Sequence, residues 1–361
     1  MGRQELSEAE KTAISGYNHG LQAAIHALTS GVVWSFDSKK NQLETAMKDS
    51  ISATMEFVHQ QATGNSTQTL RSEQQTESSR KAGFEFVKQL AAELSTGTFE
   101  LPPFPEAALR VRDALNDSQV DVDKIARIVL SEPVLSARLL RLANSALLKR
   151  GTMEITDVKQ AIGRLGFEMV RNAAVSMAMD SSFPTPRDPA IRQHFETTRT
   201  HSVQVAVLSY ILAKHHAQGI KPDDALLTGL LHDIGRFYIL TRVTAFPELF
   251  SDPQVLEELV YNWHTGVGRA IIESWGFPES IAGAVDEHEV LDREHQGNAD
   301  LADVIMVANL LSHIGEPRDP PLPPFNQIPA CGKLKLNEHT CINVVTDAEE
   351  EVRSMTLALG G

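Results

Sequence analysis

Four histidines and one aspartate are the residues of this chain whose types and spacing could do chemistry. His232 and Asp233 are adjacent in an apolar stretch, and His201, His264 and His288 lie in three other stretches with helical spacing. Buried imidazole and carboxylate groups are costly unless they are paired, hydrogen-bonded or metal-bound. Together they suit a divalent ion (Mn, Mg, Fe or Zn), which turns a bound water into a nucleophile near neutral pH. The set predicts a phosphohydrolase-type site with one or two metal ions.

A structural interpretation of the same residues stays open. The chain has 13 histidines, and a single histidine on a helix is more often a core or surface residue than a ligand. The His232–Asp233 pair is more specific, although such a pair can also be a structural hydrogen-bonded knot. We assign seven other histidines to the surface or the core: His19, His59, His194, His215, His216, His295 and His313.

The two cysteines form a weaker candidate. Cys331 and Cys341, with His339 between them, could suggest a metal knuckle. Nine intervening residues and the lack of a fourth ligand favour free thiols instead. Two cysteines do not make a disulfide framework, so a reducing cytoplasm is the simpler expectation.

The elements that position these residues are predicted to be helices. Apolar residues recur every three or four positions, and no stretch alternates with a period of two, so we expect an all-α protein. In a continuous helix the adjacent His232 and Asp233 point about 100° apart. The helices expected after residue 100 are 107–115, 122–130, 133–150, 155–179, 194–216, 225–240, 256–275, 281–289 and 301–314.

Three regions are expected along the chain. Residues 1–97 form an N-terminal helical region, a candidate dimerisation element, in which 61–80 is so polar that it is a connector or a fully solvated helix. Its helices are 7–28, opened by a capping box of Ser7 and Glu10, then 43–58, and one that ends near Gly97. Prolines at 102, 103 and 105 start a second domain, 98–316, in extended form.

The third region, 317–361, begins with a proline-rich strap. Thr346 and Glu349 form a capping box that opens a last helix ending at Leu359. We expect this region to pack on the second domain.

The charge balance excludes some partners. The chain carries 33 basic and 47 acidic residues, a net charge of −14, and no local basic patch. Such a chain repels phosphate backbones, so no nucleic acid is expected as a partner. No apolar run approaches the ~20 residues of a membrane span, and the charged N-terminus lacks a signal-peptide core. We therefore expect a cytoplasmic protein that does not bind membranes.

Several segments together resemble a known family. His201-Ser202, Leu-Leu-His-Asp-Ile-Gly at 230–235, His264-x-x-x-Gly268, Trp275-x-x-Pro278 and His288 follow one another in the order of the HD superfamily. The segments LPPFPEAALRVRDAL, SEPVLSARLLRLANSA and AIGRLG are similar to its HDOD branch, the HD-related output domain. The resemblance covers about residues 98–360 and implies a multi-helix HD-like bundle.

The resemblance also implies ligands: His201, His232, Asp233, His264 and His288 match metal-binding positions of the superfamily. Two positions depart from it, since Asn309 replaces the closing Asp and Glu289 replaces the second histidine of a pair. One negative charge is then missing, and Asp303 cannot supply it because six residues turn a helix by about 240°. Arg236 replaces the usual Lys and is a candidate phosphate contact; no catalytic residue is assigned firmly.

HDOD proteins are generally regulatory modules with an incomplete HD site. We therefore expect a cytoplasmic signal-transduction protein that acts through contacts with other signalling proteins, with homodimerisation as a further expectation. Its degenerate site would hold a divalent metal weakly. The alternative is a metal-dependent phosphohydrolase, a phosphodiesterase acting on nucleotide-like phosphate esters.

Overall fold

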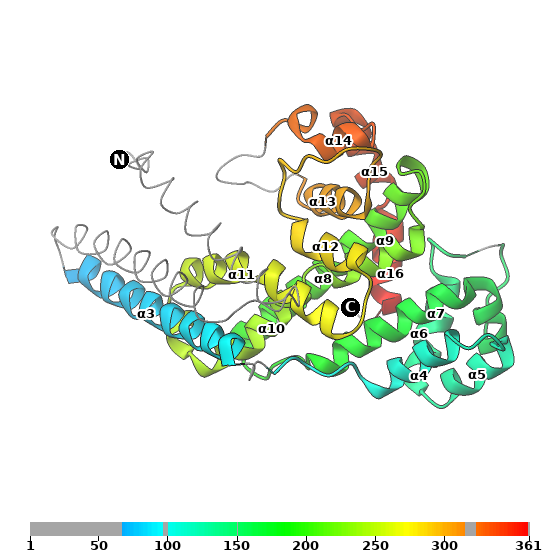
Figure 1. Cartoon of the computed structure of the whole chain (residues 1–361), viewed down its shortest axis with the longest axis horizontal. Coiled ribbons are helices and arrows are strands. Elements are labelled where there is room, and N and C mark those ends of the chain that lie inside the picture. The colour runs from blue at the N-terminus through cyan, green and yellow to red at the C-terminus, as the bar shows by residue number, and fades with distance from the viewer. Residues whose placement is uncertain (1–66, 97–99, 150, 315–322, 360–361) are drawn as a thin grey trace, which may run out of the picture. The chain divides into compact units, whose positions relative to one another are not determined.

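The computed structural model describes residues 67–96, 100–149, 151–314 and 323–359. Every regular element in these ranges is a helix and none is a strand, which confirms the all-α prediction (Figure 1). No helix in these ranges is long and apolar enough to cross a membrane. The helices expected at 7–28 and 43–58 and most of the proline-rich strap lie outside the described residues.

The helices follow one another with short connections. In chain order they are α3 (Thr67–Thr96), α4 (Glu106–Leu115), α5 (Val122–Leu130), α6 (Pro133–Asn144), α7 (Val158–Ser182), α8 (Pro189–His216), α9 (Pro222–Leu231), α10 (Ile234–Arg242), the 3-10 turns η1 (Val243–Ala245) and η2 (Pro247–Ser251), α11 (Pro253–Ser274), α12 (Glu279–Glu287), α13 (Leu301–Ser312), η3 (Phe325–Gln327), α14 (Pro329–Lys333), α15 (Glu338–Asp347) and α16 (Glu349–Leu359).

The chain divides into two compact units. One comprises residues 1–100 and 245–262, and the other comprises 101–244 and 263–361. The sequence did not indicate that 245–262 groups with the N-terminal residues. The domain boundaries proposed at 97/98 and 316/317 stay predictions.

Helix α8 is central to the larger unit. On one side its Val203 and Val207 join a fully apolar cluster with α4 to α7, α9 and α16. On another side its Leu208 and Leu212 join a cluster with α13, α14 and α15. Figure 1 shows α4 to α7 at one end of this unit and α13 to α15 at the other. His201 lies seven residues before Leu208 and so on the same face of α8, and this packing holds it in a fixed position.

The expected continuous helix 225–240 is wrong at the residues that matter most. Helix α9 ends at Leu231 and α10 begins at Ile234, with Asp233 outside the helical region at φ −101° and ψ 17°. The break follows from packing, because α10 must lie against α11 while α9 lies against α8. His232 and Asp233 therefore occupy a corner between two helices, and they are not the mid-helix pair that the apolar pattern predicted.

Gly235 fixes the start of α10 against α11. A Cβ at this position would lie 1.9 Å from the backbone oxygen of His264 and 2.7 Å from the nitrogen of Gly268. Backbone atoms on both sides cannot move aside cheaply. Only glycine allows the two helices to approach this closely beside two of the candidate ligands.

We expect Gly235→Ala to destabilise the protein by about 1–3 kcal/mol, because the added methyl group forces two packed helices apart. Gly163→Ala in α7 is the matched control, since a Cβ there meets no atom within 4 Å. Urea denaturation of both variants gives the comparison. Equal midpoints for the two variants would show that α10 and α11 can separate without cost.

The smaller unit joins α3 to residues 245–262. The ring of Phe86 meets Phe246 edge to face at 5.7 Å, and the hydroxyl of Ser79 donates to the backbone oxygen of Glu248 at 2.6 Å. The polar stretch 61–80 is therefore helical in its described part. It is not fully solvated, because Ser79 is buried.

Two further expectations need correction. The helix expected at 155–179 is interrupted at Gly166, which adopts φ 79° and ψ 169°. The capping box of Thr346 and Glu349 is wrong, since Thr346 lies inside α15 and α16 begins at Glu349 itself. The sequence pattern did not predict α14 and α15, which are short and carry few apolar residues.

The cysteines are free thiols, as expected. Burial raises the pKa of Cys331 to about 12 and the pKa of Cys341 to about 11. Both therefore stay protonated near neutral pH, and a thiol is a poor metal ligand in this state.

Candidate metal site

The five predicted ligands come together at one place in the larger unit. His201 comes from α8, His264 from α11 and His288 from the residue after α12, while His232 and Asp233 form the corner between α9 and α10. His232, His264 and His288 are fully buried, and Asp233 is 3% exposed. Only His201 reaches the surface, with 16% of its side chain exposed. The binding of a metal by these residues stays a prediction.

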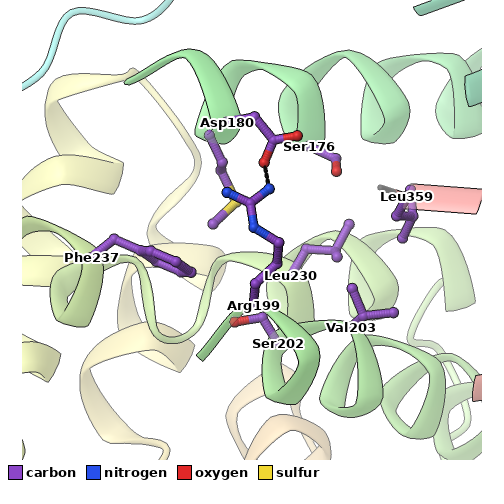
Figure 2. A pocket seen from close by; sticks show the side chains of 9 residues that line it. Ser176, Asp180, Arg199, Ser202, Val203, Leu230, Phe237 and Leu359 are labelled. Carbon is purple, nitrogen blue, oxygen red and sulfur yellow. Dashed lines mark hydrogen bonds and ion pairs between the residues drawn. The ribbon is translucent and has the colours of Figure 1, made fainter. Parts of the chain in front are cut away.

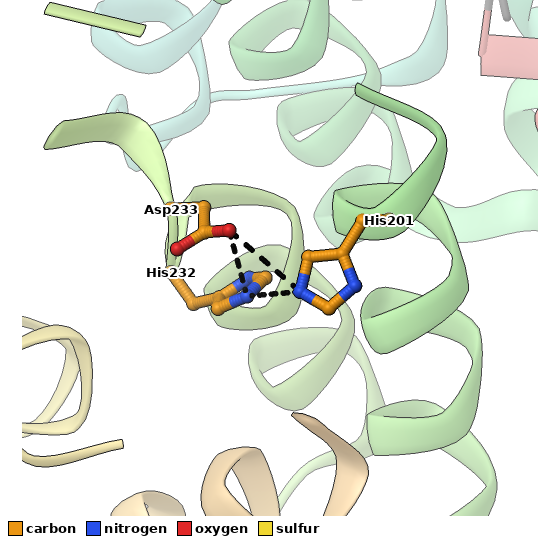
Figure 3. Close-up of side chains that lie close together, drawn as sticks. All are labelled: His201, His232 and Asp233. Carbon is orange, nitrogen blue, oxygen red and sulfur yellow. Dashed lines mark hydrogen bonds and ion pairs between the residues drawn. The ribbon is translucent and has the colours of Figure 1, made fainter. Parts of the chain in front are cut away.

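The carboxylate of Asp233 is the centre of the cluster. Its Oδ2 lies 3.6 Å from the Nε2 atoms of both His201 and His232, and these two nitrogens are 3.2 Å apart (Figure 3). Its Oδ1 lies 3.5 Å from Nε2 of His264 and 3.7 Å from Nε2 of His288, and this second pair is also 3.2 Å apart. Each carboxylate oxygen therefore faces one pair of imidazoles.

Hydrogen bonds on the far side of the rings assign their tautomers. His232 donates from Nδ1 to the backbone oxygen of Gly229 at 2.8 Å, and His288 donates from Nδ1 to the oxygen of Val285 at 2.7 Å. A carbonyl oxygen only accepts, so the proton of each neutral ring is on Nδ1 and the lone pair is on Nε2.

The same assignment holds for His201. The Ser312 hydroxyl lies 3.4 Å from its Nδ1 and donates its own proton to the backbone oxygen of Asn309 at 2.7 Å. The hydroxyl therefore acts as acceptor towards the ring, which again leaves the Nε2 lone pair pointing at Asp233. Two lone pairs that face each other at 3.2 Å repel unless a cation lies between them.

The charge state at neutral pH suits a metal. Burial lowers the pKa of His201 to about 4, against the opposing effect of Asp233, and lowers the pKa of His232 well below its usual value. Burial alone would raise the pKa of Asp233, but Arg236 at 3.1 Å and the surrounding histidines hold it well below its usual range. The neutral imidazoles of His201 and His232 thus lie beside an ionised carboxylate.

The distances also fit metal coordination. Metal bonds of about 2.0–2.2 Å place neighbouring ligand atoms roughly 3–3.5 Å apart, close to the separations found here. The ligand atoms of His201, His232 and Asp233 lie within 4.8 Å of one another, as do those of Asp233, His264 and His288. With Asp233 shared, the residues fit two adjacent ions, and their nitrogen-rich composition favours Zn, Fe or Mn over Mg.

Glu289 is a residue whose role the sequence did not reveal. Its Oε1 lies 3.8 Å from Nε2 of His288 and accepts a hydrogen bond from Nδ2 of Asn309 at 3.2 Å. A carboxylate from position 289 thus lies near the cluster and is held by the amide of Asn309, the residue at the position where the family resemblance implied an aspartate. His313 also lies beside the histidine cluster, because the centre of its ring is 4.8 Å from the centre of the His201 ring.

A separate group formed by His295, Asp300 and Asp303 could also hold an ion by spacing alone. Its carboxylates are already paired with cations, because Arg293 bridges Asp300 at 2.7 Å and Asp303 at 3.2 Å, and Lys333 lies 4.0 Å from Asp303. His295 donates to Asp303 at 2.7 Å. This group ties the loop after α12 to the start of α13. Asp303 belongs to this group and not to the histidine cluster.

Because of His201, the free energy of unfolding of the metal-free protein is expected to decrease as the pH is lowered. Its pKa is 6.5 when exposed and about 4 when folded, so the unfolded chain binds the extra proton between these values. The free energy of unfolding therefore decreases as the pH falls from about 6.5 to about 4, by roughly 3 kcal/mol.

Denaturation of chelator-treated protein at several pH values measures this slope. We expect His201→Asn to flatten it, whereas His215→Asn, at the exposed end of the same helix, should leave it unchanged. A slope that is equally steep in His201→Asn would contradict the assignment.

Comparison with known proteins identifies the class of protein that this fold and site define. The HDOD domain family matches residues 101–291, which is more than half of the chain, and the chain belongs to this family. The match includes all five candidate ligands and Glu289, and it ends before Asn309.

Individual relatives are distant. The chain is similar to an uncharacterised protein of Treponema pallidum (strain Nichols), with 22% identity over 67% of this chain and 47% of that protein. It thus spans about half the length of this curated relative.

Two crystal structures share the fold. One is a "putative metal-dependent phosphohydrolase" from Shewanella amazonensis SB2B, with a TM-score of 0.65, 22% identity, and coverage of 77% of this chain and 99% of that one. The other is a "putative signal transduction protein" from Marinobacter aquaeolei VT8, with a TM-score of 0.53, 18% identity, and coverage of 79% and 65%. At these identities the similarity establishes the fold alone.

Proposed function

We propose that this chain is a regulatory HDOD protein of the cytoplasm that binds divalent transition metal in its interior and acts through contacts with other signalling proteins. His201, His232, Asp233, His264 and His288 hold the metal. When bound, the ion supplies a positive charge and a Lewis acid. The imidazoles of His201, His232 and His288 orient their Nε2 lone pairs towards it, and Asp233 provides the negative charge between the two pairs.

One observation carries the metal-binding part of the proposal. The His201–His232 pair has both Nδ1 atoms engaged with oxygen acceptors, so that two lone pairs meet at 3.2 Å beside a carboxylate. A structural hydrogen-bonded knot would pair a donor with an acceptor at this point. Lone pair against lone pair beside a negative charge is the arrangement of a cation site.

Burial supports a regulatory role over catalysis. Three of the four histidines are fully buried and Asp233 is 3% exposed. Catalytic metal sites keep an open position for substrate, whereas closed sites hold structure. A closed site on four helices lets metal occupancy set the stability of the bundle and of the surface it offers to partners.

Elemental analysis of the purified full-length protein, followed by zinc and manganese titration of chelator-treated protein, tests the proposal. We expect about one to two ions per chain and a rise in melting temperature on reloading, since a ligand that binds only the folded state stabilises it. A chain that binds neither ion would overturn the proposal.

The alternative, a phosphohydrolase acting on nucleotide-like phosphate esters, is favoured by one observation. His201 is 16% exposed, and Arg236, a cation suited to phosphate, borders Asp233. Hydrolysis of cyclic dinucleotides and of p-nitrophenyl phosphate with added Mn²⁺ separates the two functions. Robust turnover that is lost in His232→Ala would establish the enzyme and reject a purely regulatory role.

A further inference from the structure

The larger unit contains a cavity apart from the histidine cluster. Its space, counted together with its opening to solvent, is about 370 Å³, and residues of α7, α8, α9, α10 and α16 line it. Its walls are mainly apolar, and Figure 2 shows that the side chain of Arg199 also lines it. The apolar walls are Met179, Val203, Leu230, Phe237 and Leu359.

Two arginines share a single carboxylate at this cavity. Arg199 and Arg138 bind opposite oxygens of Asp180, with the Nη2 of Arg138 at 2.7 Å. Arg138 is 3% exposed and also donates to the hydroxyl of Ser176 at 2.9 Å. Since Asp180 and Ser176 both line the cavity, Arg138 supports its polar wall from behind. Among the described residues both arginines pair with this one carboxylate, so one of the two positive charges is left uncompensated.

The two arginines also carry more N–H donors than the neighbouring residues offer acceptors. The buried Nε of Arg138 has no hydrogen-bond partner among the described residues. Both guanidinium groups lie against the one carboxylate of Asp180, so the two positive charges repel each other at short range. An additional anion at the cavity would relieve that repulsion.

We propose that this cavity binds a small organic carboxylate. The carboxylate group would pair with the guanidinium of Arg199, which has the planar fork that suits it. The apolar body of the ligand would lie against Phe237 and Leu230. An inorganic phosphate fits less well, because five apolar side chains would face its remaining charge.

The cavity and the histidine cluster share their helices. Arg199 lies two residues before His201 on α8, Leu230 lies two residues before His232 on α9, and Phe237 follows Arg236, the partner of Asp233. A ligand that repositions these walls therefore also shifts the metal ligands. This coupling rests on the proposed metal binding, whereas binding of the carboxylate does not.

The binding test uses chelator-treated full-length protein and benzoate as the probe, followed by calorimetry or ligand-observed NMR. We expect saturable binding that is weakened about 10- to 100-fold in Arg199→Gln and less in Arg199→Lys. Arg192→Gln, which removes an exposed arginine from the same helix, should bind as the wild type does.

Three results would overturn the carboxylate site: no saturable binding of benzoate, equal binding of the neutral analogue benzamide, or equal binding by Arg199→Gln. Because Arg199→Gln could fail for lack of folding, Leu359→Trp provides a second variant that fills the cavity without touching the charges. It should also abolish binding. Binding of inorganic phosphate in place of benzoate would likewise reject the organic ligand.

The coupling is measured by titrating zinc with and without saturating benzoate. We expect the zinc dissociation constant to change by at least about fivefold, and zinc to change benzoate affinity by the same factor, since coupling is reciprocal. Identical zinc affinities would overturn the coupling. Benzoate binding by a protein that binds no zinc would support the cavity and reject the proposed metal function.

Discussion

We expect Asp233→Asn to abolish zinc and manganese binding while the protein stays folded. Asp233 is the carboxylate that both imidazole pairs face, at 3.5–3.7 Å. Removing a charge about 4 Å from a cation costs about 4 kcal/mol per unit of ion charge at an effective dielectric constant near 20, or roughly a thousandfold in affinity. The amide also brings a donor that can bond a facing Nε2 lone pair, which stabilises the metal-free state and weakens binding further.

Calorimetric titration of chelator-treated protein gives the affinity, and thermal denaturation shows whether the variant is folded. Asp113→Asn is the matched control, because its carboxylate is 71% exposed and lies on α4. Undiminished affinity in a folded Asp233→Asn would mean that metal binds elsewhere in the chain.

Much of the architecture could be predicted because helix periodicity is a local signal. The helix starts at Val122 and Pro133 follow from Asp121, whose side chain accepts from the backbone nitrogen of Lys124, and from a proline that fits the first turn. The five candidate ligands could also be predicted from the sequence, because polar residues are conspicuous in apolar stretches. Their convergence required the fold, because they come from different helices.

The corner at His232 and Asp233 could not be predicted from the same signal. The stretch 225–240 is nearly all apolar, so its periodicity gives no reason for a break. The break depends on close approaches to other helices, such as that of Gly235 to His264, and these are long-range contacts. Without it, Asp233 could not face both histidine pairs.

The carboxylate of Glu289 near the cluster could not be predicted for a related reason. Replacement of the expected aspartate by Asn309 indicated a missing negative charge. Glu289 follows His288 directly, and its carboxylate returns towards the site because the Asn309 amide holds it there at 3.2 Å. Asn309 thus positions a carboxylate instead of supplying one, which sequence spacing alone does not reveal.

Asn309→Asp should therefore raise metal affinity and destabilise the metal-free protein. The new carboxylate would lie next to that of Glu289. At a distance of roughly 6 Å its attraction to a cation is about 3 kcal/mol, or roughly a hundredfold in affinity. Without metal, the two carboxylates repel or share a proton, which lowers the melting temperature.

Zinc titration and thermal denaturation of Asn309→Asp, Glu289→Gln and the wild type give the comparison. We expect Glu289→Gln to weaken metal binding at least as strongly as Asn309→Asp strengthens it. If Glu289→Gln binds metal as the wild type does, Glu289 is not part of the site and its contact with Asn309 serves packing alone.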